Sequence, residues 1–254
     1  MNRYKKILKI RKDLRSNKVS IGSWIQIPNS EVAEIMGDSG YEWMAIDMEH
    51  GSISLNQLPN IFRALELGNT LPLVRVTNND VDLANKVLDA GSGGVIFPKI
   101  ETSEQLKELR NNISLPTKGE RGIGFSRANL YGKNFETYVS QFQNPFLVGM
   151  IESEKGVKNL SSILEVKGLD AIFIGPYDLS ASLGEIGNFQ SQLFKENINQ
   201  IIKICKLKKV PIGIHIVYPD KVLLNRTIKQ GFQFIAYSID SLFLRKNSLN
   251  PIQK

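Results

Sequence analysis

The chain has 254 residues, 42% of them hydrophobic and 22% charged, a length that suits one α/β barrel. It contains no apolar run long enough to cross a membrane, and its basic N-terminus lacks the apolar core and cleavage site of a secretory signal, so we expect no membrane partner. The net charge of +7 comes from scattered lysines without a nucleic-acid-binding motif, so we expect no nucleic-acid partner either.

Short β-rich runs alternate with segments of helical periodicity along the chain. The basic N-terminal segment predicts a solvated amphipathic helix. Strands are predicted over Ser20–Ile27, Trp43–Asp47, Leu71–Val76, Gly94–Pro98, Phe146–Glu152, Ala171–Gly175, Pro211–Ile216 and Phe234–Ser238. Helices are predicted over Ser30–Ser39, Leu55–Leu67, Val81–Ala90, Ser103–Asn111, Ser161–Glu165, Gln192–Leu207 and Pro219–Gln230. Eight near-continuously apolar strands, most of them followed by a helix, are typical of a (β/α)8 TIM barrel, and we predict a single such domain over residues 1–254.

The connections between these elements carry two further signals. Glycines close several helical segments and predict left-handed helix caps, namely Gly40, Gly68, Gly91, Gly168 and Gly231. The interval 113–145 is irregular and glycine-rich, and loops of that length are usually functional or act as lids. The single cysteine, Cys205, cannot form an intrachain disulfide, which favours a cytoplasmic location, and its apolar surroundings predict a buried thiol.

Polar side chains gather at the ends of the predicted strands. In such barrels the chemistry lies at the C-terminal ends of the strands. Every predicted strand from the second to the eighth ends in an ionisable or hydroxyl group, including Asp47, His50, Arg75, Lys99, Glu152, Asp178, His215, Tyr218, Ser238 and Asp240. Because a random surface would not sort these groups to one end, the pattern predicts an active site on that face.

Glu152 and Asp178 each follow a short apolar run. A carboxylate at the tip of a buried strand is costly unless it is paired, and two such groups on neighbouring strands could share one hard divalent cation such as Mg²⁺ or Mn²⁺. The alternative is a pair of solvated loop acids. Thiolate and multiple histidine ligands are absent from the sequence pattern, which argues against structural zinc.

Four other strand-end residues, His50, Arg75, Lys99 and His215, are candidates for the pocket. His50 is either a hydrogen-bonded structural residue or a general base, and Arg75 favours an oxyanion or carboxylate ligand. Lys99 could form a Schiff base, but beside a metal pair it is better read as a charge on the pocket rim. His215 is interpreted as pocket lining.

A set of motifs in order resembles the HpcH/HpaI aldolase family over about residues 18–245. The family implies a TIM barrel of the phosphoenolpyruvate/pyruvate-binding type. It also implies a class II aldolase that uses Mg²⁺, Mn²⁺ or Co²⁺ to stabilise a pyruvate enolate, and that forms or cleaves 4-hydroxy-2-oxo acids from pyruvate and an aldehyde. The motifs are Asp47–Gly51, Val74–Arg75, Leu88–Gly91, Phe97–Glu101, Gly119–Gly124 with Arg127–Ala128, Met150–Glu152 and Gly175–Ser180.

The resemblance also implies roles for individual residues. Glu152 and Asp178 would ligate the metal, with Asp47 ordering a metal-bound water. Arg75 would stabilise the enolate oxygen, and His50, supported by Asp89, would transfer the proton. The substrate would be bound by Arg75 and by the segment containing Gly175, Pro176, Tyr177 and Ser180, with backbone amides near Tyr177 and Asp178 holding its carboxylate.

Asp89 precedes the fourth predicted strand, whereas His50 follows the second, so the two residues belong to opposite ends of one barrel. We therefore expect Asp89 to reach His50 of a neighbouring subunit in a homo-oligomer, a trimer or hexamer, with active sites at its interfaces.

Two other functions remain open. A malyl-CoA or citramalyl-CoA type of lyase would need a groove for the CoA portion, for which Arg121 or Arg127 of the long loop could serve. A non-catalytic oligomeric binding protein on the same scaffold is also possible, because fold does not fix function.

Overall fold

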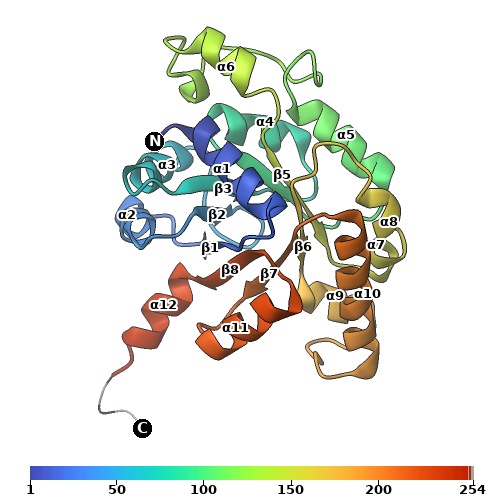
Figure 1. Cartoon of the computed structure of the whole chain (residues 1–254). Coiled ribbons are helices and arrows are strands. Elements are labelled where there is room, and N and C mark those ends of the chain that lie inside the picture. Colours follow the sequence, from blue (N-terminus) through green and yellow to red (C-terminus); the bar gives the residue numbers. More distant parts are fainter. Residues whose placement is uncertain (251, 253–254) are drawn as a thin grey trace.

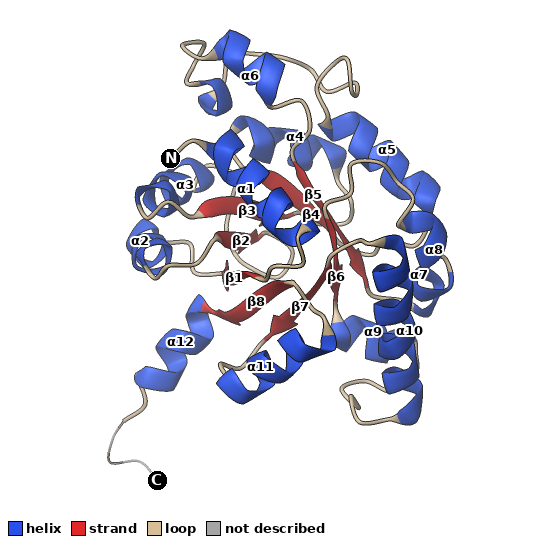
Figure 2. Cartoon of the chain, in the orientation of Figure 1, coloured by secondary structure: helices blue, strands red, loops and turns tan. Residues whose placement is uncertain are grey.

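The computed structural model describes residues 1–250 and 252, so residues 251, 253 and 254 at the end of the predicted domain lie outside it. Eight parallel strands close into a barrel in sequence order (Figures 1 and 2), which confirms the predicted TIM fold. The strands are β1 (Ser20–Ile25), β2 (Trp43–Asp47), β3 (Leu71–Arg75), β4 (Gly94–Phe97), β5 (Phe146–Ile151), β6 (Ala171–Ile174), β7 (Ile212–Ile216) and β8 (Phe234–Ile239).

Helices surround the barrel, as Figure 2 shows. They are α1 (Arg3–Arg15), α2 (Ser30–Asp38), α3 (Leu58–Leu67), α4 (Val81–Asp89), α5 (Ser103–Ile113), η1 (Arg127–Asn129), α6 (Phe135–Gln141), α7 (Glu154–Lys158), α8 (Leu160–Ile163), α9 (Pro176–Ser182), α10 (Gln192–Lys208), α11 (Lys221–Gln230) and α12 (Asp240–Asn247). None of the described helices is both long and apolar enough to cross a membrane.

Aromatic side chains fill the N-terminal part of the barrel interior. Trp43 at the start of β2 stacks on Phe234 at the start of β8, with ring centroids 4.0 Å apart, and Phe146 packs against the same ring at 5.5 Å. A Cβ atom at Gly22 would stand 2.1 Å from the Trp43 ring, so only glycine fits beside it. This packing fills the N-terminal end of the barrel interior, so polar groups can line the C-terminal end.

The long segment between α5 and β5 is not a lid over the C-terminal face. It connects the end of α5 to the start of β5, so it lies at the N-terminal end of the barrel. In Figure 1, α6 lies at the top of the view and α9, which follows β6, lies well below it. Arg127 of this segment donates hydrogen bonds to Glu66 (2.7 Å) and to the Ala90 carbonyl (3.1 Å). These bonds hold the segment at the N-terminal end of the barrel.

Two predicted connections differ in detail. Gly40, Gly91, Gly168 and Gly231 have the expected positive φ, but Gly68 has φ of −78° and the left-handed residue is Asn69, with φ of 58°. A Cβ atom at Gly68 would stand 2.3 Å from the backbone of Gly37, so Gly68 allows α2 and α3 to pack closely. The predicted helix Ser161–Glu165 is two short helices, α7 and α8, that begin earlier.

Candidate active site

A pocket of about 210 Å³ opens at the C-terminal end of the barrel. Eight of the ten predicted site residues line it, namely Asp47, His50, Arg75, Glu152, Gly175, Pro176, Tyr177 and Asp178. The pocket is also lined by Trp24, Gln26, Met150, Phe173 and His215. Of the predicted residues, Asp89 and Ser180 are not part of this lining.

Asp47 and Arg75 form the central ion pair of the pocket. They are register partners at the ends of β2 and β3, and both are largely buried. The guanidinium binds the carboxylate in bidentate fashion, through Nε to Oδ1 (2.9 Å) and Nη2 to Oδ2 (2.8 Å). Burial alone would raise the pKa of Asp47, but the hydrogen bonds and charge of Arg75, together with the Gln26 amide, lower it. Asp47 is therefore ionised and holds Arg75 in one orientation.

Glu49 is a site residue that the sequence prediction did not include. Its Oε2 lies 3.2 Å from Nη1 of Arg75, and its side chain is 10% exposed. Arg75 thus uses three of its five N–H groups on Asp47 and Glu49, which leaves two for a ligand. Glu49 lies two residues beyond Asp47 at a strand end, and this position could have marked it as a candidate site residue. The sequence does not show, however, which acid faces the arginine.

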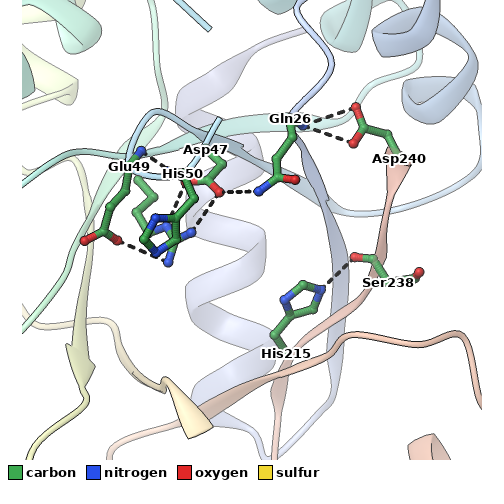
Figure 3. Close-up of polar contacts among 8 residues, drawn as sticks. Gln26, Asp47, Glu49, His50, His215, Ser238 and Asp240 are labelled. Atoms are coloured by element: carbon green, nitrogen blue, oxygen red, sulfur yellow. Dashed lines mark hydrogen bonds and ion pairs between the residues drawn. The ribbon is translucent and has the colours of Figure 1, made fainter. Parts of the chain in front are cut away.

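Figure 3 shows Asp47, Glu49 and His50 gathered at the end of β2. Oδ1 of Asp47 accepts hydrogen bonds from the backbone N–H groups of Glu49 (3.1 Å) and His50 (3.2 Å). The same carboxylate therefore fixes both Arg75 and the loop that carries His50. The imidazole of His50 is exposed and lines the pocket.

Glu152 follows β5 and is 4% exposed. Its Oε2 accepts a hydrogen bond from the backbone N–H of Lys99 (2.8 Å), a residue held at φ of 50°. Burial, together with the negative charges of Asp178 and Glu49, raises the pKa of Glu152 to about 7 despite that hydrogen bond. The side chain of Lys99 is exposed, as expected for a charge on the rim.

Asp178 lies in the first turn of α9. Pro176 occupies the first helical position, where its missing N–H costs nothing. Gly175 caps the helix and packs against Glu152: a Cβ atom there would stand 2.3 Å from Oε1. The strand-end glycine therefore brings the turn with Asp178 against the buried carboxylate.

Ser180 is buried within this helix and its hydroxyl is already used. Its Oγ donates to the Tyr177 carbonyl (2.7 Å) and accepts from the Gly187 N–H (2.9 Å). The structure thus gives Ser180 a role in holding the α9 turn, and its predicted direct contact with substrate has no support in this geometry.

Asp89 lies at the end of α4, at the opposite end of the barrel from His50, as predicted. Its Oδ1 binds Nη2 of Arg121 (2.6 Å), and its side chain is 51% exposed. Arg121 is 2% exposed and also donates to the Tyr138 hydroxyl (2.9 Å). Asp89 is therefore held firmly at the base while part of its carboxylate faces outward.

Within the described part of the chain, no group of three or more His, Cys, Asp or Glu side chains is arranged to hold a metal ion. Glu152 and Asp178 alone could supply two oxygen ligands, and water or substrate would complete the coordination shell of a hard cation. The raised pKa of Glu152 fits this assignment, because a nearby cation would remove the penalty of ionising it. The carboxylate pair suits Mg²⁺ or Mn²⁺ better than a soft metal.

The raised pKa of Glu152 predicts a pH-dependent stability of the metal-free protein. In the unfolded chain the group loses its proton near pH 4.5, but in the folded chain only near pH 7, so stability falls as the pH rises through this window. Glu152→Gln should remove most of that fall and raise the unfolding temperature at pH 8 by about 5 °C. Thermal unfolding in chelator from pH 5 to pH 8 measures this, and the exposed Glu136→Gln control should keep the wild-type slope.

The chain matches known proteins over most of its length. A family model for HpcH/HpaI aldolase/citrate lyase matches residues 20–246. The chain is 33% identical over 229 residues to the 2-dehydro-3,6-dideoxy-6-sulfogluconate aldolase of Pseudomonas putida, covering 89% of each chain. It is 30% identical over 236 residues to the hydroxypyruvate/pyruvate aldolase of Roseobacter denitrificans, covering 92% of this chain and 91% of the relative.

The fold agrees as well. The crystal structure of an HpcH/HpaI aldolase/citrate lyase family protein from Burkholderia cenocepacia matches with a TM-score of 0.87 and 27% identity, over 94% of this chain and 95% of that one. This likeness extends over almost the whole barrel. The chain therefore belongs to the HpcH/HpaI aldolase/citrate lyase family and is a carbon–carbon lyase of the aldolase type.

Proposed function

We propose that the enzyme forms and cleaves 4-hydroxy-2-oxo acids, joining a 2-oxo acid such as pyruvate to an aldehyde in a reaction that needs a divalent cation. The observation that carries this proposal is the pocket itself: a buried carboxylate, Glu152, with Asp178 beside it, faces the same space as Arg75. Such a pocket suits a small anionic substrate that binds a cation and a guanidinium together. We also propose a cytoplasmic location, since the single cysteine, Cys205, is a free thiol.

Glu152 and Asp178 are the proposed ligands of the cation, which is Mg²⁺, Mn²⁺ or Co²⁺ in this proposal. When bound, the cation supplies Lewis-acid chemistry by polarising the carbonyl of the 2-oxo acid. Asp47 lies within the pocket and is proposed to contact the cation only through water, because Arg75, Gln26 and the loop after β2 occupy its oxygens.

Arg75 is proposed to hold the negative charge that develops on the keto oxygen when C3 loses its proton. Its two remaining N–H groups are fixed in place by Asp47 and Glu49, so they need little reorganisation during the reaction. The first-turn N–H groups of Tyr177 and Asp178 have no acceptor within α9 and are proposed to bind the substrate carboxylate. Gly175 and Pro176 shape that turn.

His50 is proposed to move the proton of the 4-hydroxyl group, since its imidazole stands exposed at the mouth where an aldehyde would enter. Asp89 is its proposed partner from a second subunit. The outward-facing carboxylate of Asp89, anchored by Arg121, is suited to such a contact. The proposed assembly is a homotrimer or a hexamer with active sites at its interfaces.

The CoA-type lyase is less well supported than the aldolase. Arg121 and Arg127 are nearly buried, and their guanidinium groups bind Asp89 and Glu66 at the opposite end of the barrel from the pocket. Because both guanidinium groups are nearly buried and already paired with carboxylates, neither is free to bind the phosphates of CoA. The family match and the aldolase relative also favour an aldolase over a CoA-type lyase.

Metal-dependent chemistry on pyruvate tests the proposal directly. Exchange of the C3 protons of pyruvate with deuterated water should require Mn²⁺ or Mg²⁺ and stop in chelator, and Arg75→Lys should slow it by at least tenfold because the bidentate fork is lost. Proton NMR measures the exchange, and a panel of aldehydes then identifies the acceptor. Exchange that survives chelation would contradict a cation-dependent mechanism, and no exchange at all would contradict pyruvate as the nucleophile.

Gly175→Ala tests the proposed metal ligands. The added methyl group would displace Oε1 of Glu152, so the affinity for Mn²⁺ should fall by at least tenfold, as measured by calorimetric titration. Gly122→Ala is the matched control, because a Cβ atom there meets nothing within 4 Å and Mn²⁺ binding should stay at the wild-type level. Equal Mn²⁺ affinity in both variants would argue against Glu152 as a ligand.

Mixed oligomers test the shared site. His50→Ala and Asp89→Asn should each lower activity by at least tenfold as pure oligomers. If His50 and Asp89 act across an interface, co-assembly of the two variants restores some sites with both native residues, and activity should recover to roughly a quarter of wild type. Activity of the mixture no higher than the mean of the two variants, or a fully active monomeric Asp89→Asn protein, would exclude an interfacial dyad.

A further inference from the structure

His215 is a pocket residue that the proposed mechanism does not use. It lies on β7, and its ring stacks on Trp24 with centroids 5.5 Å apart and an interplanar angle of 28°. Trp24 in turn meets Phe173 edge-on at 6.0 Å. Trp24 and Phe173 are almost fully buried, whereas His50 and Tyr177 are exposed, so His215 belongs to the deep wall of the pocket and not to its mouth.

The hydrogen bond of this ring fixes its tautomer. Nε2 lies 2.9 Å from the carbonyl oxygen of Ser238, and because a carbonyl can only accept, Nε2 carries the proton (Figure 3). Burial first, and then the charge of Arg75, lowers the pKa of His215 to about 4. The imidazole is therefore neutral at physiological pH, and its other nitrogen, Nδ1, carries a lone pair.

That lone pair is available to a ligand. Over residues 1–250 and 252, Nδ1 has no protein hydrogen-bond partner. Figure 3 shows the ring with one nitrogen on Ser238 and the other turned towards the side of the pocket where Asp47 and His50 lie. A neutral acceptor beside the Trp24 and Phe173 rings favours a ligand that can donate a hydrogen bond, and it is left unpaired by a ligand that presents only a methyl group.

We propose that His215 is a specificity-determining residue whose Nδ1 accepts a hydrogen bond from a hydroxyl group on C3 of the bound 2-oxo acid. The inference rests on the proposed function, in which the 2-oxo acid occupies the deep part of the pocket and the aldehyde enters past His50. The favoured nucleophile is then a 3-hydroxy-2-oxo acid such as hydroxypyruvate, in preference to pyruvate, whose C3 methyl has no donor.

The reaction balances without a further reactant. In the addition direction C3 loses one proton and bonds to the carbonyl carbon of the aldehyde, and the aldehyde oxygen takes up one proton. The product is a 3,4-dihydroxy-2-oxo acid. The formal oxidation at C3 and the formal reduction at the aldehyde carbon cancel, so no external oxidant or reductant is needed. His215 keeps its proton on Nε2 throughout and acts by binding.

The test compares two 2-oxo acids with one aldehyde. With Mn²⁺ and a fixed aldehyde, the wild-type kcat/KM for hydroxypyruvate should exceed that for pyruvate by about tenfold, as expected for one well-placed hydrogen bond. His215→Leu should lower this ratio about tenfold, and His215→Gln, which keeps an acceptor atom, should restore part of it. A ratio is used because damage to folding or metal binding lowers both rates alike.

A matched control and a second comparison sharpen the result. Met150→Leu, a change of similar volume in the same pocket, should keep the wild-type ratio. With pyruvate fixed, glycolaldehyde is compared with acetaldehyde: if His215→Leu alters this ratio instead of the first, the hydroxyl belongs to the aldehyde and the C3 assignment is overturned.

The remaining outcomes are distinct. Turnover of pyruvate without any preference for hydroxypyruvate, or an unchanged ratio in His215→Leu, overturns the role of His215 while leaving the aldolase function intact. No metal-dependent turnover of either acid overturns the proposed function, and this inference with it.

Discussion

The buried ion pair between Asp47 and Arg75 is the interaction on which the pocket depends. The register of β2 and β3 places the two residues opposite each other, and the alternation of side chains along each strand points both into the barrel. A slip of one residue would turn both away. Removing Arg75 would leave the buried carboxylate of Asp47 without a charged partner, a loss of about 3–5 kcal/mol. The same carboxylate also holds the loop after β2 through the N–H groups of Glu49 and His50.

The charges of the pocket do not cancel, and this imbalance organises its chemistry. Four carboxylates, those of Asp47, Glu49, Glu152 and Asp178, face one guanidinium, that of Arg75, while His215 is neutral. If all four acids were ionised, the local charge would be −3. The protein relieves part of this excess by raising the pKa of Glu152, and a divalent cation would relieve it further. Burial is the largest cause of that pKa shift, and the same excess of negative charge that favours a cation adds to it.

The sequence predicted the barrel well because burial on both faces makes its strands continuous apolar runs, and each observed strand lies within two residues of its prediction. Asp47, Arg75 and Glu152 could be assigned for the same reason, since each stands where such a run stops. Contacts that depend on side-chain direction could not be assigned: the pairing of Glu49 with Arg75, the internal use of the Ser180 hydroxyl, and the free nitrogen of His215. The long loop was misjudged because its length says nothing about which end of the barrel it covers.

The opposite placement of His50 and Asp89 limits how copies of this chain could assemble around a shared site. A contact between the C-terminal end of one barrel and the N-terminal end of another joins two different surfaces, so each subunit would offer one half-site and receive another. Such a head-to-tail contact either closes into a ring or continues as an open filament. A ring of three subunits, either as a trimer or as each half of a hexamer, would close in this way. In such a ring, surface residues far from the pocket set the angle between neighbouring barrels. That angle decides whether each His50 meets the Asp89 of its neighbour.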